Sequence, residues 1–138
     1  MIKKYGILCD EARIIREAVF IKEQGFKKEF DEIDKIAKHV VFYDNDNPIA
    51  TCRYYASEHA NEYIVGRVAI MKPYRGKKIG NYFLKMVEEM ICSEGGNKIV
   101  LSAQVRVKDF YIKNGYITKG STYYDEYCEH IHMEKTLT

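Results

Sequence analysis

The sequence lacks several features that would point to a membrane or secreted protein. No apolar run approaches the about 20 residues that a membrane-spanning helix needs. Residues 1–9 include lysines but no long apolar segment followed by a small-residue cleavage site, so we expect no signal peptide. The four cysteines are scattered without a C-x-x-C pair, which argues against a zinc site and a disulfide framework. We therefore expect a cytoplasmic protein with reduced thiols and no bound metal.

Excess charge and nucleotide-binding motifs are also missing. The 22 basic and 20 acidic residues leave a net charge of +2, which does not call for nucleic acid or an anionic membrane as a partner. Neither a Walker phosphate loop nor a G-x-G-x-x-G dinucleotide fingerprint is present, and we find no internal repeat. The length of 138 residues is that of one domain, 1–138, with one hydrophobic core.

Hydrophobic periodicity predicts an alternation of strands and helices. A helix with Asp10 as its N-cap begins after the first strand, and residues 26–38 form a polar loop with one short helical turn. This order predicts an α/β (α+β) fold, in which helices flank a mixed, mostly antiparallel sheet of six to seven strands. The expected strands are 2–8, 39–43, 49–55, 63–70, 98–103, 116–124 and 128–137, and the expected helices are 10–24, 79–91 and 107–114.

The most informative segment is a basic, glycine-containing turn at residues 71–81, between a strand and an amphipathic helix. The first N–H groups of a helix have no partner inside it, and the helix dipole favours an anion there. Gly76 and Gly80 allow the backbone to approach a ligand closely, while Arg75, Lys77 and Lys78 add positive charge. The turn is therefore a candidate phosphate site, although a solvated basic turn would have the same composition.

This turn resembles the Arg/Gln-x-x-Gly-x-Gly/Ala fingerprint of the GCN5-related N-acetyltransferase (GNAT) superfamily. Arg75 and Gly80 match its ends, and Lys78 stands where the middle glycine usually is. The segment from Phe110 to Tyr116 is similar to the Phe-Tyr-x-x-x-Gly-Phe element of the same superfamily.

Further ordered matches make the chain similar to the small bacterial subfamily labelled ElaA- or YjcF-like acetyltransferases. The resemblance covers nearly the whole sequence. Its pieces are Val19-Phe20-x-x-Glu23-Gln24, Asp34-x-x-Ala37-x-His39, Ala50-Thr51-x-Arg53, Gly66-Arg67-Val68-Ala69, Ala103-Gln104 and His130-x-x-Met133.

The resemblance implies an acetyl-coenzyme A-dependent N-acetyltransferase that works by direct attack of an amine in a ternary complex. It also implies that main-chain groups hold the cofactor, with an N–H near Ile70 facing the thioester oxygen. The strand residues implied for the pantetheine arm are Val68, Ala69 and Ile70, and those implied for the diphosphate are Arg75, Gly76, Lys77, Lys78, Ile79, Gly80 and Asn81.

Two side chains are candidates for the proton transfers. Tyr111, in the Phe-Tyr element, is the candidate acid for the thiolate leaving group, because a phenol of pKa about 10 can protonate a thiolate whose acid has a pKa of about 8.5. It also contributes to the cofactor site. His130 is the candidate base, and His132, on the same strand face, or a water chain are the alternatives. Core packing would explain a tyrosine or histidine at these positions equally well.

The acceptor is the least determined partner, since a small amine, an amino acid, an aminoglycoside-like compound and a protein amine all fit. A homodimer is compatible with the resemblance. A catalytically silent acetyl-coenzyme A sensor and a nucleic-acid-binding domain are the rival classes. Candidate acceptor contacts, which could instead be ion-paired or solvated, are Arg53, Arg67, Gln104, Asp125 and Glu126.

Overall fold

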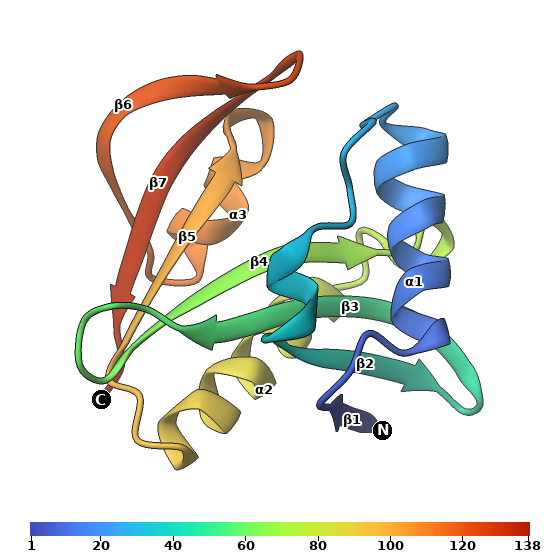
Figure 1. Ribbon diagram of the computed structural model, residues 1–138, viewed down its shortest axis with the longest axis horizontal. Coiled ribbons are helices and arrows are strands. Elements are labelled where there is room, and N and C mark those ends of the chain that lie inside the picture. Colours follow the sequence, from blue (N-terminus) through green and yellow to red (C-terminus); the bar gives the residue numbers. More distant parts are fainter. The chain divides into compact units, whose positions relative to one another are not determined.

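Seven strands form one sheet in the computed structural model, which describes residues 1–138 (Figure 1). Their order in the sheet is β1-β2-β3-β4-β5-β7-β6, so that β4 and β5, which are joined through helix α2, are neighbours. The predicted mixed sheet with flanking helices is confirmed. The elements are β1 Ile2–Tyr5, α1 Asp10–Arg16, β2 Lys38–Asp44, β3 Asn47–Ala56, β4 Glu62–Ile70, α2 Ile79–Ser93, β5 Lys98–Gln104, α3 Lys108–Lys113, β6 Ile117–Asp125 and β7 Cys128–Thr136.

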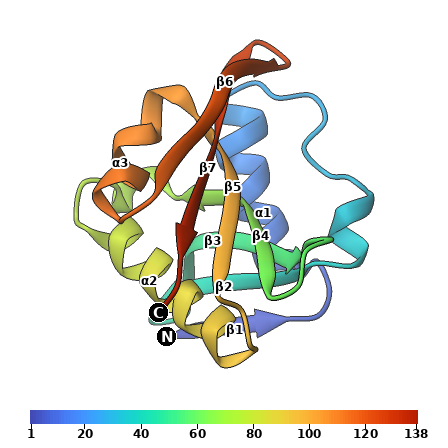
Figure 2. The same cartoon turned by 90° about the vertical axis from the view of Figure 1, so that its left-hand side faces the viewer.

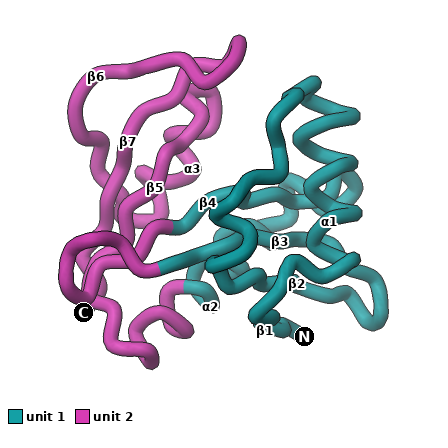
Figure 3. Tube along the Cα trace, viewed as in Figure 1, with its two compact units in different colours: residues 1–55, 65–87 teal, residues 56–64, 88–138 magenta.

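The chain divides into two compact units, which are coloured separately in Figure 3. Unit 1 contains Met1–Tyr55 and Val65–Val87, and unit 2 contains Ala56–Ile64 and Glu88–Thr138. Strand β4 and helix α2 each contribute residues to both units. None of the helices combines the length and the apolar character that crossing a bilayer would require.

In unit 1, strands β1, β2 and β3 form an antiparallel meander. Val40 and Val41 on β2 and Ala50 on β3 are fully buried and supply part of the core. The register places His39 opposite Arg53, so a histidine and an arginine are brought together inside this unit. The expected strands 39–43 and 49–55 lie within β2 and β3, on either side of an Asp/Asn-rich turn.

The N-terminal helix differs from its prediction. Only Asp10–Arg16 is α-helical, and Glu17–Glu23 continues as a π-helix, in which the Gln24 N–H donates to the Val19 carbonyl oxygen over 3.1 Å. The N-cap is Cys9 and not Asp10, because Cys9 has an extended backbone and its carbonyl accepts the Arg13 N–H. The Asp10 carboxylate instead lies in the first turn, where the helix dipole favours negative charge.

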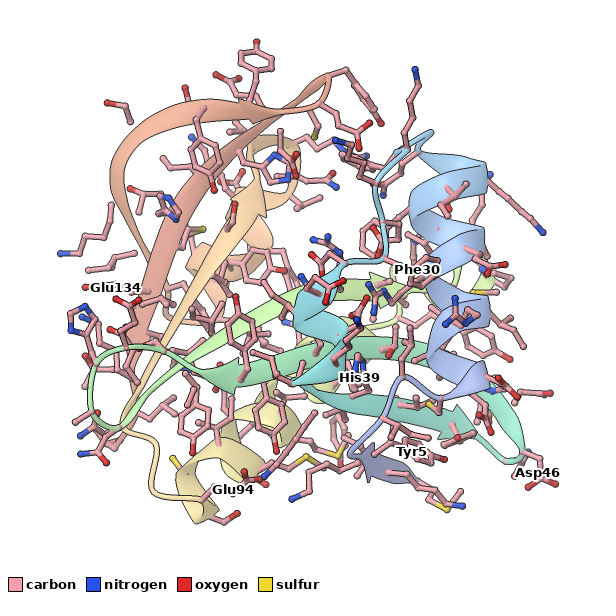
Figure 4. All side chains as sticks on the ribbon, in the orientation of Figure 1. Tyr5, Phe30, His39, Asp46, Glu94 and Glu134 are labelled. Carbon is pink, nitrogen blue, oxygen red and sulfur yellow. The ribbon has the colours of Figure 1, made fainter.

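In unit 2, β7 lies between β5 and β6 as the centre of an antiparallel three-stranded group, visible edge-on in Figure 2. Leu101, Ala103 and Met133 are buried on one face, and the alternate residues on β5 and β7 are mostly polar. Glu134, labelled in Figure 4, accepts from Lys98 at 3.1 Å and is 3.4 Å from Lys119. One face of this group therefore packs a core, and the other carries polar side chains.

Helix α2 buries the predicted apolar stripe. Phe83, Leu84 and Val87 are almost fully buried in unit 1, and Ile91 is fully buried in unit 2. The helix ends at Ser93, and Gly95 just beyond it has a φ of 93°, a backbone conformation that favours glycine.

Candidate active site

The basic turn after β4 has the geometry of an anion site. A short 3-10 helix at Lys72–Tyr74 follows the strand, and α2 begins at Ile79. The Tyr82 N–H donates to the Lys78 carbonyl at 3.2 Å and closes the first helical turn. The N–H groups that begin α2 therefore have no partner inside the helix and are free to meet an anion.

Lys78 adopts the backbone conformation that glycine usually supplies. Its φ is 61°, and that of Gly76, two residues earlier, is 78°. A left-handed conformation costs a residue with a side chain about 1 kcal/mol or more. Lys78 thus holds a left-handed backbone at the position where the fingerprint usually has a glycine.

Arg75 is occupied by protein groups. Its Nε donates to the Ile70 carbonyl at 2.9 Å, while Nη1 and Nη2 donate to the two Glu23 carboxylate oxygens at 2.5 and 2.8 Å. The hydrogen bonds that Arg75 donates to Glu23 are the main reason that the pKa of Arg75 is raised. Its backbone N–H donates to the Lys72 carbonyl at 3.2 Å. The groups of the turn that remain for a diphosphate are those of Gly76 to Asn81.

The end of β4 is held from both sides. The Met71 N–H donates to the Ile49 carbonyl at 2.8 Å, next to the Ile70 carbonyl that accepts from Arg75. Arg67, three residues earlier, has a φ of 53° inside the strand, which interrupts regular strand geometry. The segment Val68 to Ile70, for which main-chain cofactor contacts were predicted, lies between these two fixed points.

Arg53 and Arg67 join a network of acids in residues 29–34. Arg53 is 4% exposed, forms a bidentate pair with Asp31 at 2.6 and 3.1 Å, and donates to Asp34 at 2.9 Å. Arg67 is more exposed and donates to the Glu29 main-chain carbonyl at 3.1 Å and to Asp31 at 3.3 Å. Arg53 is therefore a buried structural cation, and Arg67 is the better placed of the two to meet a ligand.

Arg16, which is fully buried, completes this network from helix α1. It donates to Asp34 at 2.7 and 3.1 Å and to Glu29 at 2.8 Å, and its guanidinium lies over the Phe30 ring (Figure 4). Burial would raise the pKa of Asp34, but hydrogen bonds from Arg16, the Asp31 N–H and Arg53 hold it well below its usual range. Burial raises the pKa of Glu29 against the influence of Arg67 and Arg16.

His39, also labelled in Figure 4, is a structural residue. Its Nε2 lies 3.0 Å from the Asp34 carbonyl, and since a carbonyl only accepts, this nitrogen carries the proton. Burial lowers the pKa of His39, so the imidazole favours the neutral form.

Tyr111 lies on α3 in unit 2 with its ring held between two aromatic neighbours. It makes edge contacts with Phe110 at 5.0 Å and with Tyr116 at 5.7 Å between ring centroids, and it is largely buried. The Tyr116 hydroxyl donates to the buried Glu88 carboxylate, so that neighbouring tyrosine has a packing role. Phe110 and Tyr116 therefore fix the orientation of the Tyr111 ring, which carries the predicted acid.

His130 on β7 is oriented by its own strand. Its Nδ1 lies 3.0 Å from the Cys128 carbonyl, which can only accept, so Nδ1 carries the proton and Nε2 is the proton acceptor. The ring is 8% exposed and stacks on Tyr123 at 6.1 Å, whereas His132 is exposed and contacts the same ring at 4.8 Å. The structure therefore distinguishes the two histidines that the sequence could not separate.

The other unit 2 candidates lie on the same hairpin or beside it. Gln104 is opposite His130 in the sheet register, and its Oε1 accepts from Arg106 at 2.8 Å. Asp125 ends β6, and Glu126 in the following turn has a φ of 54°. Both acids are exposed. A polar hollow elsewhere in unit 2, formed by residues 56–63 with Glu94 and Gly95, includes none of the predicted site residues.

Two contacts are visible only in the folded structure. Tyr123 belonged to no motif, although the stretch from Tyr123 to Cys128 was expected to shape the acceptor pocket, and strand pairing places its ring against His130. Glu23 belonged to a recognised motif and was a possible partner for Arg53 or Arg67, but it pairs with Arg75, which is 52 residues away in the chain.

Comparisons with known proteins show the family to which the chain belongs. Residues 10–137 match the family model for the acetyltransferase (GNAT) domain. The chain is 28% identical to the uncharacterised N-acetyltransferase YjcF of Bacillus subtilis over 128 residues, which cover 91% of this chain and 90% of YjcF.

Two solved structures have the same fold over nearly their full length. A Lactobacillus plantarum crystal structure assigned to the N-acetyltransferases superposes with a TM-score of 0.91 at 27% identity and covers 100% of this chain and 98% of that one. Escherichia coli ElaA superposes with a TM-score of 0.85 at 24% identity and 98% coverage of both chains. The ElaA- and YjcF-like resemblance is thereby confirmed, and the chain belongs to the GNAT acetyltransferase family and is an N-acetyltransferase.

Proposed function

We propose that this N-acetyltransferase moves the acetyl group of acetyl-coenzyme A to a primary amine by direct attack in a ternary complex. The observation that carries the proposal is the turn before α2. Lys78 holds a left-handed backbone at the position of the usual glycine, and unpaired N–H groups begin the helix. Together they place main-chain donors and positive charge at one turn, as a diphosphate site requires.

In this mechanism, the N–H groups from Gly76 to Asn81 bind the coenzyme A diphosphate, with Lys77 and Lys78 adding positive charge. Main-chain groups of Val68, Ala69 and Ile70 bind the pantetheine arm and polarise the thioester carbonyl. An N–H aimed at the oxygen where negative charge develops stabilises the transition state of acyl transfer.

The amine must lose a proton, and the departing thiolate must gain one. We assign the first step to Nε2 of His130, whose acceptor state follows from the Nδ1 contact with Cys128. We assign the second step to the hydroxyl of Tyr111. The nitrogen lone pair attacks the thioester carbon, the C–S bond breaks as the tetrahedral intermediate collapses, and the amide and free coenzyme A are released.

For the acceptor, we propose Arg67 and Gln104 as contacts, together with Asp125 and Glu126 in the β6–β7 turn. Arg53 is left out, because its buried guanidinium is already paired with Asp31 and Asp34. The exposed acids of the turn suit a cationic acceptor, which remains to be identified among small amines and protein amines.

A two-step experiment tests the function. Acetyl-coenzyme A at about 100 times its Kd should stabilise the protein by about 2.7 kcal/mol, because only the folded state binds it. An amine library is then screened for release of free coenzyme A thiol. No rise in melting temperature at millimolar ligand would reject the cofactor assignment. Binding without thiol release from any amine would instead support a catalytically silent sensor.

A further inference from the structure

Glu23 and Arg75 form a two-pronged ion pair that the predicted roles do not use. The pair joins the last residue of the π-helix to the basic turn, with both carboxylate oxygens and both Nη atoms engaged. Planar fork-to-fork contacts of this kind fix direction as well as charge. The third guanidinium nitrogen, Nε, donates to the Ile70 carbonyl at 2.9 Å.

The contacts of Arg75 therefore reach the part of β4 that precedes the cofactor turn. The Ile70 carbonyl and the Met71 N–H belong to one peptide group, which Arg75 holds on one side and Ile49 on the other. A peptide held at both its N–H and its C=O has little freedom to rotate. The direction of Glu23 depends on the π-helix, because i to i+5 bonding widens the turn and shifts where its side chains point.

Charge and geometry give opposite expectations for this pair. If Arg75 is a phosphate ligand, Glu23 competes with the cofactor for the guanidinium and weakens binding. If Arg75 is a positioning residue, Glu23 supports the cofactor site and strengthens binding. Three of the five guanidinium N–H groups of Arg75 have protein partners on all three nitrogens, and its backbone N–H donates to the Lys72 carbonyl. These contacts fix the plane of the guanidinium against Glu23 and Ile70.

On these grounds we propose that Glu23 and Arg75 are a positioning pair, which holds the end of β4 and the start of the turn in the geometry that binds coenzyme A. Phosphate contact belongs to the N–H groups that follow Arg75, with Lys77 and Lys78 adding positive charge. The proposal rests on the proposed use of acetyl-coenzyme A, and it adds two positioning residues that do not touch the reacting atoms.

Direct measurement of coenzyme A affinity by calorimetry tests the pair without an acceptor. Glu23→Gln removes a negative charge near the phosphates, yet positioning predicts that it weakens binding by roughly tenfold. Arg75→Lys keeps the charge but loses the fork and should weaken binding to a similar degree. Glu17→Gln, which makes the same charge change at the other end of the π-helix, should leave the affinity unchanged.

A second readout separates positioning from lost phosphate contact. Arg75→Gln removes the positive charge and therefore carries this test. Loss of a direct phosphate contact would flatten the dependence of its affinity on salt, whereas loss of positioning leaves that dependence close to that of wild type. Both side chains of the pair are more than one third exposed, so the variants should keep melting temperatures close to wild type.

The outcomes distinguish the inference from the function on which it rests. Unchanged or tighter binding by a folded Glu23→Gln variant overturns the positioning role and leaves the proposed function intact. Absence of coenzyme A binding by the wild-type protein overturns both. If Glu23→Gln fails to fold, the affinity of Arg75→Lys and the salt dependence of Arg75→Gln decide the matter.

Discussion

Lys78 shows how a single backbone conformation links stability to ligand binding. A left-handed lysine costs about 1 kcal/mol, and glycine would remove that strain while adding about 0.5–1 kcal/mol of entropy cost on folding. We predict that Lys78→Gly is as stable as Lys78→Met or slightly more so, by under about 1 kcal/mol, in urea unfolding.

If the N–H groups bind the diphosphate, the coenzyme A affinity of both variants stays within a few-fold of wild type. A large equal loss in both variants would assign the ammonium group to the phosphates.

The role of the Tyr111 hydroxyl can be tested without changing the packing of its ring. Replacing it with phenylalanine keeps the ring between Phe110 and Tyr116 but removes the proton donor. We predict a fall in kcat of about 100-fold or more with little change in coenzyme A affinity, since acid catalysis contributes about 10²–10⁴. A phenol donates only while protonated, so the alkaline limb of the pH–rate profile should disappear. Tyr124→Phe, at an exposed position, is the control, and an unaltered profile for Tyr111→Phe would remove its role.

His130 and His132 form a matched pair for the base. In His130→Asn, the amide nitrogen is bonded to Cγ as Nδ1 is and can still donate to the Cys128 carbonyl, so the strand is kept while the proton acceptor at Nε2 is lost. We expect kcat at neutral pH to fall by about 100-fold or more and the acidic limb of the profile to vanish. His132→Asn should retain most of the activity. The reverse ranking of the two variants would assign the base to His132.

The loop between the π-helix and β2 is organised by charge. Arg16, Arg53 and Arg67 balance Glu29, Asp31 and Asp34, so this polar segment becomes an ordered element over the meander. A buried ion pair contributes little net stability over an apolar packing, but removing one partner leaves a buried charge unpaired. Single substitutions within the network should therefore lower the free energy of unfolding, and by different amounts at different positions.

Asp34 and Glu29 should differ in how much they stabilise the protein, because the pKa of Asp34 is lowered and that of Glu29 is raised. Asp34→Asn should cost about 3 kcal/mol at neutral pH, and Glu29→Gln clearly less, as measured by urea unfolding. The lowered pKa of Asp34 means that its stabilisation is complete above about pH 4 and is lost as the pH falls further. The raised pKa of Glu29 acts in the opposite sense, since its contribution declines as the pH rises through that pKa.

The acid dependence of stability checks this assignment. Wild type and Glu29→Gln should lose stability below about pH 4, and Asp34→Asn should lose less there. Equal acid profiles for the wild type and the Asp34 variant would show that another carboxylate dominates acid unfolding.

At the scale of the whole molecule, the thiols favour direct transfer over a covalent acetyl-enzyme. Burial raises the pKa of Cys9, Cys52 and Cys128, which keeps these sulfurs protonated and unreactive. Cys92 is exposed on α2. We predict that acetyl-coenzyme A without an acceptor adds no acetyl group to the protein in intact-mass spectra.

Kinetics provide the complementary measurement. A ternary-complex mechanism gives intersecting initial-velocity lines once an acceptor is found, whereas an acetyl-enzyme gives the parallel lines of ping-pong kinetics. The Cys92→Ser variant should match the wild type in rate. Stoichiometric acetylation that disappears in a cysteine variant would replace direct attack with a two-step route.

The element order, the apolar stripe of α2 and the basic turn were predictable, because each depends on residues near one another in the sequence. The strand limits were correct to within a few residues, since alternation and turn residues are local signals. The N-terminal helix was predicted with the wrong cap and without its π segment, because both depend on hydrogen bonds that side-chain periodicity does not report.

The sequence alone therefore determined the family and the fold, and it predicted where a cofactor turn would lie. Only the tertiary structure decided that Arg53 is buried against acids, that Arg75 pairs with Glu23, and that Nδ1 of His130 faces the Cys128 carbonyl. The physical reason is that 22 basic and 20 acidic residues allow a great many pairings, from which long-range folding selects a few. The sign of φ at Lys78 likewise depends on how the strand, turn and helix meet in space.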